Sequence, residues 1–449
     1  MIKFSSSPLH FAAFAPLSLA LLALQITPAN ASGFALDGIG SAAMGNSFSG
    51  QVTGAHNISD MFVNPAVLTQ FSDREIVSDN MLLDYSIKIG DGATAQTAAS
   101  QNIDLAGDGS AGLDGGDILF IPALYLSRPL SDKTYFGFGV SVPWGLNSVY
   151  SDTWIGRYQA IDSKIQSINL TPAIAHKVND QLSVAGGVQL QYLDATLSTA
   201  IDFGTIASAG GPNLALDGKA EITGDAWALG YQLGLLYVPN NTTRFGVAYR
   251  SKVHHDLTGD AEFTVPTAVA AVTAGGAFVD TNITASITTP ERLTFGWQQT
   301  LSSQVELVTE ASYTRWSRLK SLTIDYANTN QPDDTTIFNW QNNWFVSTGL
   351  NYFYQKNLIL RSGIGYEGSA VTQQYFGPRV PTPNKYLLSF GGSYQVSDRL
   401  FIDANYIHYF FERGYSALPI NPANPFSGTL NTSYDLTLDG FAGSVRFIF

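Results

Sequence analysis

The chain of 449 residues contains no cysteine, so it can form neither disulfide bonds nor thiolate metal sites. Charged residues are also scarce, at 13% of the chain, against roughly 25% in an ordinary soluble domain. A surface that faces water normally carries more charge. The deficit therefore indicates an exterior that contacts lipid.

Long apolar runs are absent beyond residue 31, which excludes a helical membrane protein because a spanning helix needs ~20 apolar residues. The one apolar run, residues 11–24, is shorter than that and contains Pro16, which argues against a transmembrane anchor. It lies between Lys3 and the sequence Ala29-Asn30-Ala31. This is the layout of a secretory signal peptide, and we expect cleavage after Ala31.

Basic residues are outnumbered by acidic ones. Removing residues 1–31 takes away one base, Lys3, and no acid, which leaves 22 bases, 36 acids and a net charge of −14. A nucleic-acid-binding surface requires the opposite sign of charge. The composition therefore excludes nucleic acid as a partner.

Alternation of apolar and polar residues begins at Arg74. In the first alternating segment one face carries Val77, Met81, Leu83, Tyr85, Ile87 and Ile89, and the other carries Ser78, Asn80, Asp84, Ser86 and Lys88. Such segments recur, separated alternately by short turns and long Gly/Ala/Asp-rich loops. This is typical of an antiparallel transmembrane β-barrel with apolar residues facing lipid. A soluble sandwich or β-solenoid is the alternative.

The alternating segments number about fourteen, and an even count is what bacterial barrels require. Tyrosine and tryptophan concentrate near the predicted strand ends, where an interfacial belt would place them. The predicted strands lie near residues 74–89, 118–129, 134–144, 164–178, 182–192, 227–237, 245–249, 287–301, 305–316, 340–354, 358–367, 385–396, 400–411 and 441–449.

The leading stretch, residues 32–71, follows a different pattern. Its sequence, SGFALDGIGSAAMGNSFSGQVTGAHNISDMFVNPAVLTQF, is rich in small residues and has neither sustained period-2 nor period-3.6 alternation. It is therefore not predicted to form a wall strand. Near its end, Pro65 fixes its own φ and restricts Asn64 to extended backbone, so that Asn64, Pro65 and Ala66 form a rigid corner.

A Gly33-Phe34-Ala35 start, the Asn64-Pro65-Ala66 corner and β-patterned sequence up to Phe449 together resemble the FadL-type outer-membrane transporters of long-chain fatty acids and other hydrophobic compounds. Almost the whole mature chain takes part in the resemblance. Further stretches that are similar to family segments are Val142-Pro143-Trp144-Gly145-Leu146, Trp154-Ile155-Gly156-Arg157-Tyr158-Gln159-Ala160, Thr288-Thr289-Pro290-Glu291-Arg292, Thr314-Arg315-Trp316-Ser317-Arg318-Leu319 and Asn342-Asn343-Trp344.

The resemblance implies a hatch, residues 32–73, that plugs a fourteen-stranded barrel formed by residues 74–449. It implies a place in the outer membrane of a Gram-negative bacterium and passive uptake of a hydrophobic substrate, with no cofactor. The terminal Phe449 looks like the signal that barrel-assembly machinery recognises. Within the same fold, uptake of aromatic or alkane hydrocarbons is a second hypothesis. A surface adhesin or phage receptor with a permanently plugged barrel is a third.

A hydrophobic substrate must be stripped of lipopolysaccharide and water at the outer face. The resemblance implies that loops three and four, residues 196–222 and 263–285, form an apolar capture groove. The alternative is that their apolar residues simply cover one another. The groove candidates are Phe203, Ile206, Leu214, Phe263, Val265 and Phe278.

A carboxylate substrate also needs a cation in the lumen. Alternation predicts inward faces for Arg250, Lys252, Arg292, Arg361 and Arg446, and Arg157 lies in one of the family-like stretches. The candidates for ligand binding are Arg250, Lys252, Arg157, Arg292 and Arg361, with Arg250 and Lys252 as a tandem pair on one face. For the five cations predicted to face inward, structural ion pairs with Glu306, Glu310, Asp403 or Glu367 are the alternative.

The predicted strand 134–144 has features that weaken a strand. Gly137 and Gly139 lie in its interior and Pro143 removes a ladder donor, which favours a kink or bulge. The resemblance implies that this kink opens the wall laterally toward the membrane. The alternative is that the glycines make room for the hatch.

No catalytic or metal-binding signature is present. The mature histidines, His56, His176, His254, His255 and His408, fall in no recognisable nucleophile–base pattern, and His254-His255-Asp256 is too sparse for a metal site. The Gly- and Asp-rich residues 107–117 resemble a calcium loop only faintly. We therefore expect neither enzymatic activity nor a metal, with phospholipase chemistry as the least favoured reading.

Overall fold

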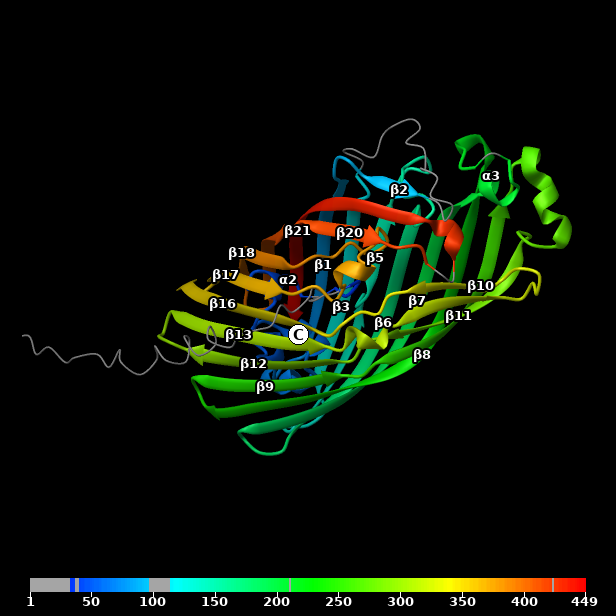
Figure 1. Ribbon diagram of the computed structural model, residues 1–449. Coiled ribbons are helices and arrows are strands. Elements are labelled where there is room, and N and C mark those ends of the chain that lie inside the picture. Colours follow the sequence, from blue (N-terminus) through cyan, green and yellow to red (C-terminus); the bar gives the residue numbers. More distant parts are fainter. Residues whose placement is uncertain (1–32, 37–39, 97–113, 210, 422–423) are drawn as a thin grey trace, which may run out of the picture.

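The computed structural model describes residues 33–36, 40–96, 114–209, 211–421 and 424–449, so the predicted signal peptide lies outside the described residues. They form one antiparallel sheet of 21 segments. Strand β1 (Glu75–Ile89) pairs with β21 (Thr429–Ile448) in continuous register from Glu75↔Ile448 to Ile89↔Tyr434, which closes the sheet on itself (Figure 1). The 21 segments join into fourteen wall strands, so the predicted fourteen-stranded barrel is confirmed.

Some wall strands are continuous and others are interrupted. The continuous ones are β3 (Asp117–Pro129), β6 (Asp162–Lys177), β7 (Leu182–Asp202), β8 (Asp217–Asn240), β17 (Leu358–Glu367), β18 (Lys385–Ser397) and β21. The interrupted ones consist of β1 with β2 (Thr94–Gln96), β4 (Thr134–Ser141) with β5 (Gly145–Val149), β9 (Thr243–Arg250) with β10 (Val253–Thr264), β11 (Thr281–Thr289) with β12 (Arg292–Thr300), β13 (Val305–Thr314) with β14 (Ser321–Tyr326), β15 (Asp334–Ile337) with β16 (Asn343–Gln355), and β19 (Leu400–Phe411) with β20 (Gly414–Leu418).

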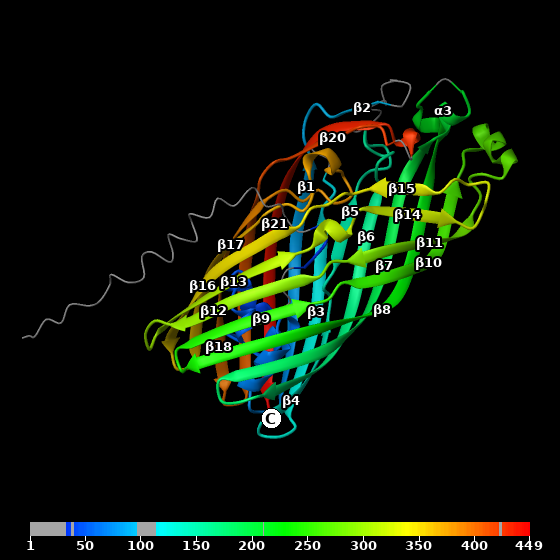
Figure 2. The same ribbon diagram turned by 60° about the horizontal axis from the view of Figure 1, so that its bottom comes forward.

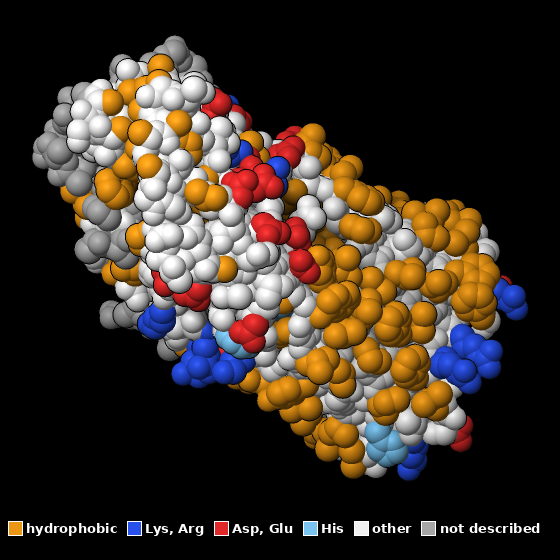
Figure 3. Space-filling view, turned by 90° about the vertical axis from the view of Figure 1, so that its right-hand side faces the viewer, with side chains coloured by type: hydrophobic (Ala, Val, Ile, Leu, Met, Phe, Trp, Pro, Cys, Tyr) orange, Lys and Arg blue, Asp and Glu red, His pale blue; other side chains and the backbone are white. Residues whose placement is uncertain are grey.

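Apolar side chains form a broad belt on the face of the barrel seen in Figure 3. On β8 the outward residues are exposed and apolar, from Trp227 at 54% and Leu229 at 69% to Tyr237 at 40%. Such exposure of large apolar side chains is what a lipid-facing surface requires. No helix in the described residues is long and apolar enough to cross a membrane.

Strand β1 differs from the prediction that apolar residues face lipid all the way round the wall. Its apolar face points inward, with Val77, Met81 and Ile87 all buried, while its outward face carries polar residues such as Asn80 and Asp84. The reason is that the lumen is filled: Val77 belongs to a core cluster with Met61 and Phe62. On β1 the hatch, and not the lipid, is the apolar partner.

The hatch lies inside the barrel (Figure 2). It contains α2 (Ser41–Met44) and the 3-10 turns η1 (Gln51–Thr53), η2 (Ile58–Phe62) and η3 (Pro65–Gln70), nearly all of whose residues are buried. The short helices of the loops are α3 (Phe203–Ile206), η4 (Leu214–Leu216), η5 (Thr267–Gly275), η6 (Trp316–Arg318), η7 (Gln373–Tyr375) and η8 (Pro425–Ser427).

Candidate functional site

The Asn64 corner is bonded both to the hatch and to the wall. The Asn64 side chain accepts a hydrogen bond from the Ala66 amide at 3.0 Å and donates to the carbonyls of Val52 at 2.7 Å and Leu235 at 3.0 Å. Directly opposite lies Gly234, where a Cβ atom would be 2.0 Å from the Asn64 oxygen. The wall therefore provides a glycine where the corner approaches it.

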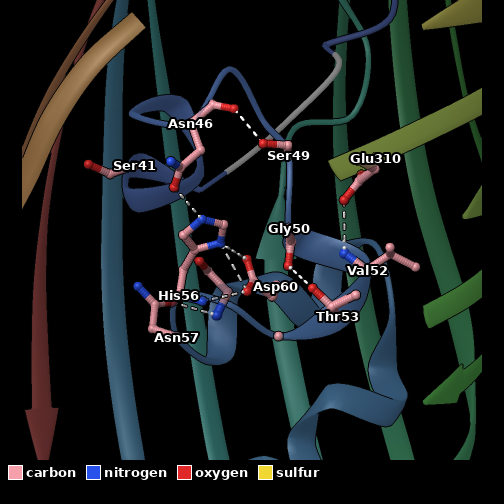
Figure 4. Close-up of polar contacts among 12 residues, drawn as sticks. Ser41, Asn46, Ser49, Gly50, Val52, Thr53, His56, Asn57, Asp60 and Glu310 are labelled. Atoms are coloured by element: carbon pink, nitrogen blue, oxygen red, sulfur yellow. Dashed lines mark hydrogen bonds and ion pairs between the residues drawn. The ribbon is translucent and has the colours of Figure 1, made fainter. Parts of the chain in front are cut away.

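His56 connects two parts of the hatch (Figure 4). Its Nδ1 lies 3.0 Å from Asp60 Oδ1 and its Nε2 lies 3.0 Å from Asn46 Oδ1. The Asn46 amide nitrogen donates to the carbonyls of Leu350 and Ser362, so its oxygen must face His56, and Nε2 must carry a proton. A second proton is then shared between Nδ1 and Asp60.

The same network ties the hatch to the wall. Burial raises the pKa of Asp60 above its ordinary value, and the interaction with His56 opposes that rise. Through Asn46, the pair is coupled to strands β16 and β17. Elsewhere, hatch amides donate to wall carboxylates: Ser41 to Asp79 at 3.1 Å and Val52 to Glu310 at 3.0 Å.

The wall is interrupted where the sequence predicted a kink. Strand β4 ends at Ser141 and β5 begins at Gly145. The start of the mature chain bridges this gap: the Leu36 amide donates to the Pro143 carbonyl and the Gly145 amide donates to the Phe34 carbonyl, both at 3.0 Å. Two hatch residues, Phe34 and Leu36, therefore replace ladder bonds that the wall itself does not make.

The neighbouring strand β3 is left partly unpaired. On the edge that faces β4 it pairs only from Leu124 to Pro129, and within the described strands residues 118–123 have no ladder partner there. Above them, Asn147 donates to Asp117 at 2.5 Å. Of the two glycines that were predicted to weaken this strand, Gly137 lies against the hatch. A Cβ atom there would be 2.6 Å from Leu68. The kink thus lies at residues 142–144, and Gly137 makes room for the hatch.

A small cavity, the inner cavity, lies beside this interruption. It measures about 30 Å³ and is lined by Leu36, Phe62, Pro143, Trp144, Arg250 and Arg292, among others. Arg250 and Arg292 are cross-strand partners on β9 and β12. Arg250 donates to the Phe62 carbonyl at 2.8 Å and its guanidinium lies 3.9 Å from the centre of the Phe62 ring. Arg292 donates to Thr314 at 3.0 Å.

Lys252 does not join Arg250 as predicted. Inward residues are even-numbered up to Arg250 and odd-numbered from Val253 onward, because the ladder breaks between β9 and β10. Lys252 consequently points outward and is exposed. A one-residue irregularity reverses every later side chain, and nothing in the sequence marked its position.

Two further predicted cations form ion pairs. Arg361 faces the lumen and lies 3.3 Å from Asp403, with both side chains buried. Arg157 lies in the turn after β5 and not on a wall strand, and its Nε lies 2.7 Å from Asp217. Arg361 therefore follows the structural alternative, whereas the pairing of Arg157 with Asp217 was not predicted.

The predicted loop groove is largely filled by its own residues. Phe278 packs against Phe203, with ring centres 4.9 Å apart, and against Phe263 at 6.0 Å. Ile206, Leu214 and Val265 are partly exposed. The aromatic candidates thus join α3 to the η5 loop, as the alternative reading held.

A larger cavity, the outer cavity, lies among other loops and was not predicted. It measures about 240 Å³, and its lining is mixed. The polar residues include Asp334 and Asn421, and the apolar ones include Ile337, Phe338, Trp340, Val371, Val380 and Leu418. Arg379 also lines it and donates to the Asp162 carbonyl and the Ser163 hydroxyl. Burial lowers the pKa of Arg379 to about 10, so it stays charged at neutral pH.

An aromatic cluster formed by Phe34, Trp144, Trp316 and Trp340 separates the two cavities. Phe34 is central, with ring centres 5.7 Å from Trp144, 5.1 Å from Trp316 and 6.0 Å from Trp340. Trp340 lines the outer cavity and Trp144 the inner one. Trp144 and Trp316 belonged to family-like stretches, but nothing in the sequence indicated that they meet Phe34.

A closed barrel with an apolar belt, a hatch bonded across its lumen and two cavities with an aromatic cluster between them defines a plugged transport barrel of the outer-membrane type. The chain belongs to the outer membrane protein transport protein family (OMPP1/FadL/TodX), whose model matches residues 22–436. It is accordingly an outer-membrane transporter of hydrophobic compounds.

Curated relatives match along most of their length. Outer membrane protein P1 of Haemophilus influenzae is 25% identical, covering 92% of this chain and 94% of that protein. The long-chain fatty acid transport protein of Salmonella typhi is 24% identical, covering 86% and 90%. Members of the family are transport proteins.

Solved structures share the fold. A FadL homologue of Pseudomonas aeruginosa superposes with a TM-score of 0.86 at 22% identity, covering 93% of this chain and all of that one. The Ralstonia pickettii toluene transporter TbuX gives a TM-score of 0.66 at 18% identity, covering 92% and 99%.

Proposed function

We propose that this protein takes up long-chain fatty acids or similar amphiphiles with one anionic head group, by passive diffusion through the hatch region and out sideways into the membrane. The observation that carries the proposal is the pair of arginines, Arg250 and Arg292, at the inner cavity. Guanidinium groups bind carboxylates strongly in a site that excludes water. The relative named for long-chain fatty acid transport supports the same substrate class.

The route begins in the outer cavity. Its volume of about 240 Å³ is just below the range of about 300–1,000 Å³ of typical ligand pockets, so a long acyl chain would extend beyond it. Arg379 would attract the head group, and Trp340 forms part of the apolar wall. Displacing Phe34 from the aromatic cluster then opens the way to the inner cavity.

The inner cavity must expand to accept a ligand, because about 30 Å³ is roughly the volume of one water molecule. Phe62 covers Arg250 through a hydrogen bond and a cation–π contact. A substrate carboxylate that binds the Arg250 guanidinium would replace its contacts with Phe62. The hatch would then be free to move away from Arg250. The ligand thereby shifts the population between hatch conformers.

Exit would occur where β3 lacks a ladder partner beside the interruption at residues 142–144. Among the described residues, Phe34 and Leu36 of the hatch make the backbone bonds to Pro143 and Gly145 at that interruption. A hatch displacement would therefore remove the same residues that close the wall. Capture, release and exit are coupled through one segment.

The test is uptake by cells that produce Arg250→Gln/Arg292→Gln. We expect long-chain fatty acid uptake to fall at least about tenfold, the loss of one charge-assisted interaction of about 1.5–3 kcal/mol. Arg244→Gln is the matched control, because Arg244 also lies on β9 and donates to a hatch carbonyl, that of Gly54 at 3.2 Å. Unchanged uptake in the double variant contradicts the proposal.

A second candidate is uptake of neutral aromatic or alkane hydrocarbons. The observation that favours it is that Arg250 already interacts with the ring and the carbonyl of Phe62. With these partners the guanidinium does not require a bound anion. In that case the double variant takes up toluene as the wild type does and shows no discrimination between a fatty acid and the corresponding alkane.

A further inference from the structure

A group of basic side chains lies on the outer surface of the barrel, in a protein that is otherwise strongly acidic. Arg315 and Arg318 are 52% and 35% exposed, and Lys252 and Lys320 are exposed as well. The two arginines share one carboxylate, Glu291, which lies 3.3 Å from Arg315 and 2.8 Å from Arg318. We call these four cations and Glu291 the basic patch. Its net charge is +3.

The patch is held in one place by the strand register. The Arg315 amide donates to the Glu291 carbonyl at 3.0 Å, which continues the pairing of β12 with β13. Lys252 directly precedes Val253, the partner of Thr289, and thus lies beside Pro290 and Glu291. The break between β9 and β10 turns the Lys252 side chain outward, to the same side of the wall as Arg315 and Arg318.

The turn that carries the arginines is fixed from within. Trp316 and Leu319 are buried on its inner side, and Trp316 packs in the aromatic cluster. The Ser317 amide donates to the Asn342 side chain at 3.0 Å. One turn therefore presents apolar residues to the lumen and cations to the outside.

The depth of the patch follows from the aromatic residues next to it. Tyr249, Tyr313 and Trp344 occupy one level, since Tyr249 and Tyr313 both pair with Leu293 and Tyr313 pairs with Trp344. Tyrosine and tryptophan mark the lipid–water boundary. Arg315 follows Tyr313 by two residues and Lys252 follows Tyr249 by three, so the cations lie just outside that boundary.

We propose that the basic patch binds the lipid-borne phosphate of an outer-leaflet lipopolysaccharide molecule whose acyl chains lie on the belt below. The long loops are on this side of the barrel, so the neighbouring leaflet is the outer one. Arginine and lysine at this depth meet phosphates, which they bind through charge-assisted hydrogen bonds. Above the patch, His254 and Asp256 lie 3.1 Å apart and bound it on the extracellular side.

The test uses purified protein in nanodiscs of neutral phosphatidylcholine and measures binding of phosphorylated lipid A by native mass spectrometry. At about fivefold per basic group, Arg315→Gln/Arg318→Gln should weaken binding by about 25-fold. The matched control is Arg413→Gln, an exposed arginine paired with Asp435 at 2.8 Å, which should bind as the wild type does. A heat-dependent shift in gel mobility verifies that each variant is folded.

A second measurement needs no variant. The wild type should bind lipid A without phosphate groups at least about tenfold more weakly. Equal binding of the two lipids overturns the proposal, since the acyl chains alone would then account for it. Displacement of lipid A by an equal concentration of inorganic phosphate would also overturn the proposal. The same holds if the Arg413 variant loses as much binding as the Arg315/Arg318 variant.

Discussion

Single side chains determine how closely the hatch approaches the wall. Asn64 makes three hydrogen bonds at one corner, and the wall lies near enough to leave no space for a side chain at Gly234 or Gly246, where a Cβ atom would lie 2.0 Å from the Val52 carbonyl. At this scale the sequence predicted the rigid corner. It could not predict the glycines opposite, because they are about 170 residues away in the chain.

Gly234→Ala should displace the Asn64 corner. Overpacking of this kind costs about 1–3 kcal/mol. Because the barrel ladder remains intact, we expect the variant to destabilise the position of the hatch and not the wall. The measurement is ion conductance in planar bilayers, which should increase. Gly186→Ala is the control, since a Cβ atom there meets only Leu233, at 3.8 Å. A closed channel in the Gly234 variant would show that the corner does not depend on this glycine.

His56→Leu should loosen the hatch more strongly. It removes the imidazole from the buried Asp60 carboxyl group, which keeps only the bond from the backbone amide of residue 56, and breaking a buried pair costs about 3–5 kcal/mol. Because burial already raises the pKa of Asp60, the lone carboxyl group binds a proton more tightly in the folded state. The variant should therefore approach wild-type stability as the pH falls toward 4 and lose stability as it rises.

The measurement for His56→Leu is the thermal unfolding midpoint across that pH range. His176→Leu serves as the control, because His176 lies on the exposed outer side of β6, bonded to Thr134, and should change stability by less than about 0.5 kcal/mol. A His56 variant that matches the wild type at neutral pH would contradict the hydrogen-bond assignment.

Among the elements, the interrupted wall strand β4–β5 links the hatch to the barrel. Pro143 and the glycines made a weak strand predictable. That Phe34 and Leu36 complete its ladder was not predictable, since the pairing joins segments more than 100 residues apart. The same limit applies to Lys252, whose orientation depends on a break between β9 and β10 that leaves no mark in the alternation.

A disulfide across the unpaired edge of β3 should block exit. Asp117 and Asn147 are hydrogen-bonded at 2.5 Å, so Asp117→Cys/Asn147→Cys can be oxidised in a chain that has no other cysteine. We expect fatty acid uptake to fall at least about fivefold when the bridge forms, and a reductant to restore it. The control is Thr196→Cys/Thr223→Cys in the continuous β7–β8 ladder. Full uptake by the oxidised β3 variant would argue for exit elsewhere.

At the scale of the whole molecule, composition and alternation predicted most of the barrel. The low charge and regular period identified its class and its strand number. Wall strands that continue beyond the membrane, such as β7 and β8, were predicted too short because their outer parts lack the apolar alternation. The outer cavity was not predictable, since it is formed by loops from four separate parts of the chain.

Closure of the barrel places the end of the chain against its first wall strand. The Phe449 amide donates to the Arg74 carbonyl at 2.9 Å, and Arg446 pairs with Glu75 through two bonds of 2.8 Å. The Phe449 side chain itself is 66% exposed, so its ring contributes little to stability. We propose that it serves recognition by barrel-assembly machinery.

Deleting Phe449 should then lower the amount of protein in the outer membrane several-fold while hardly changing the unfolding midpoint of protein refolded in detergent. Phe449→Trp keeps an aromatic terminus and should restore the amount. A deletion that is inserted normally would mean that another feature of β21 is recognised.

The bonds from Asn46 to Leu350 and Ser362 join positions 304 and 316 residues apart. Synthesis delivers Asn46 long before the strands β16 and β17 that receive its bonds, and β18 to β21 follow later still. These bonds between hatch and wall can therefore form only after most of the chain has been made.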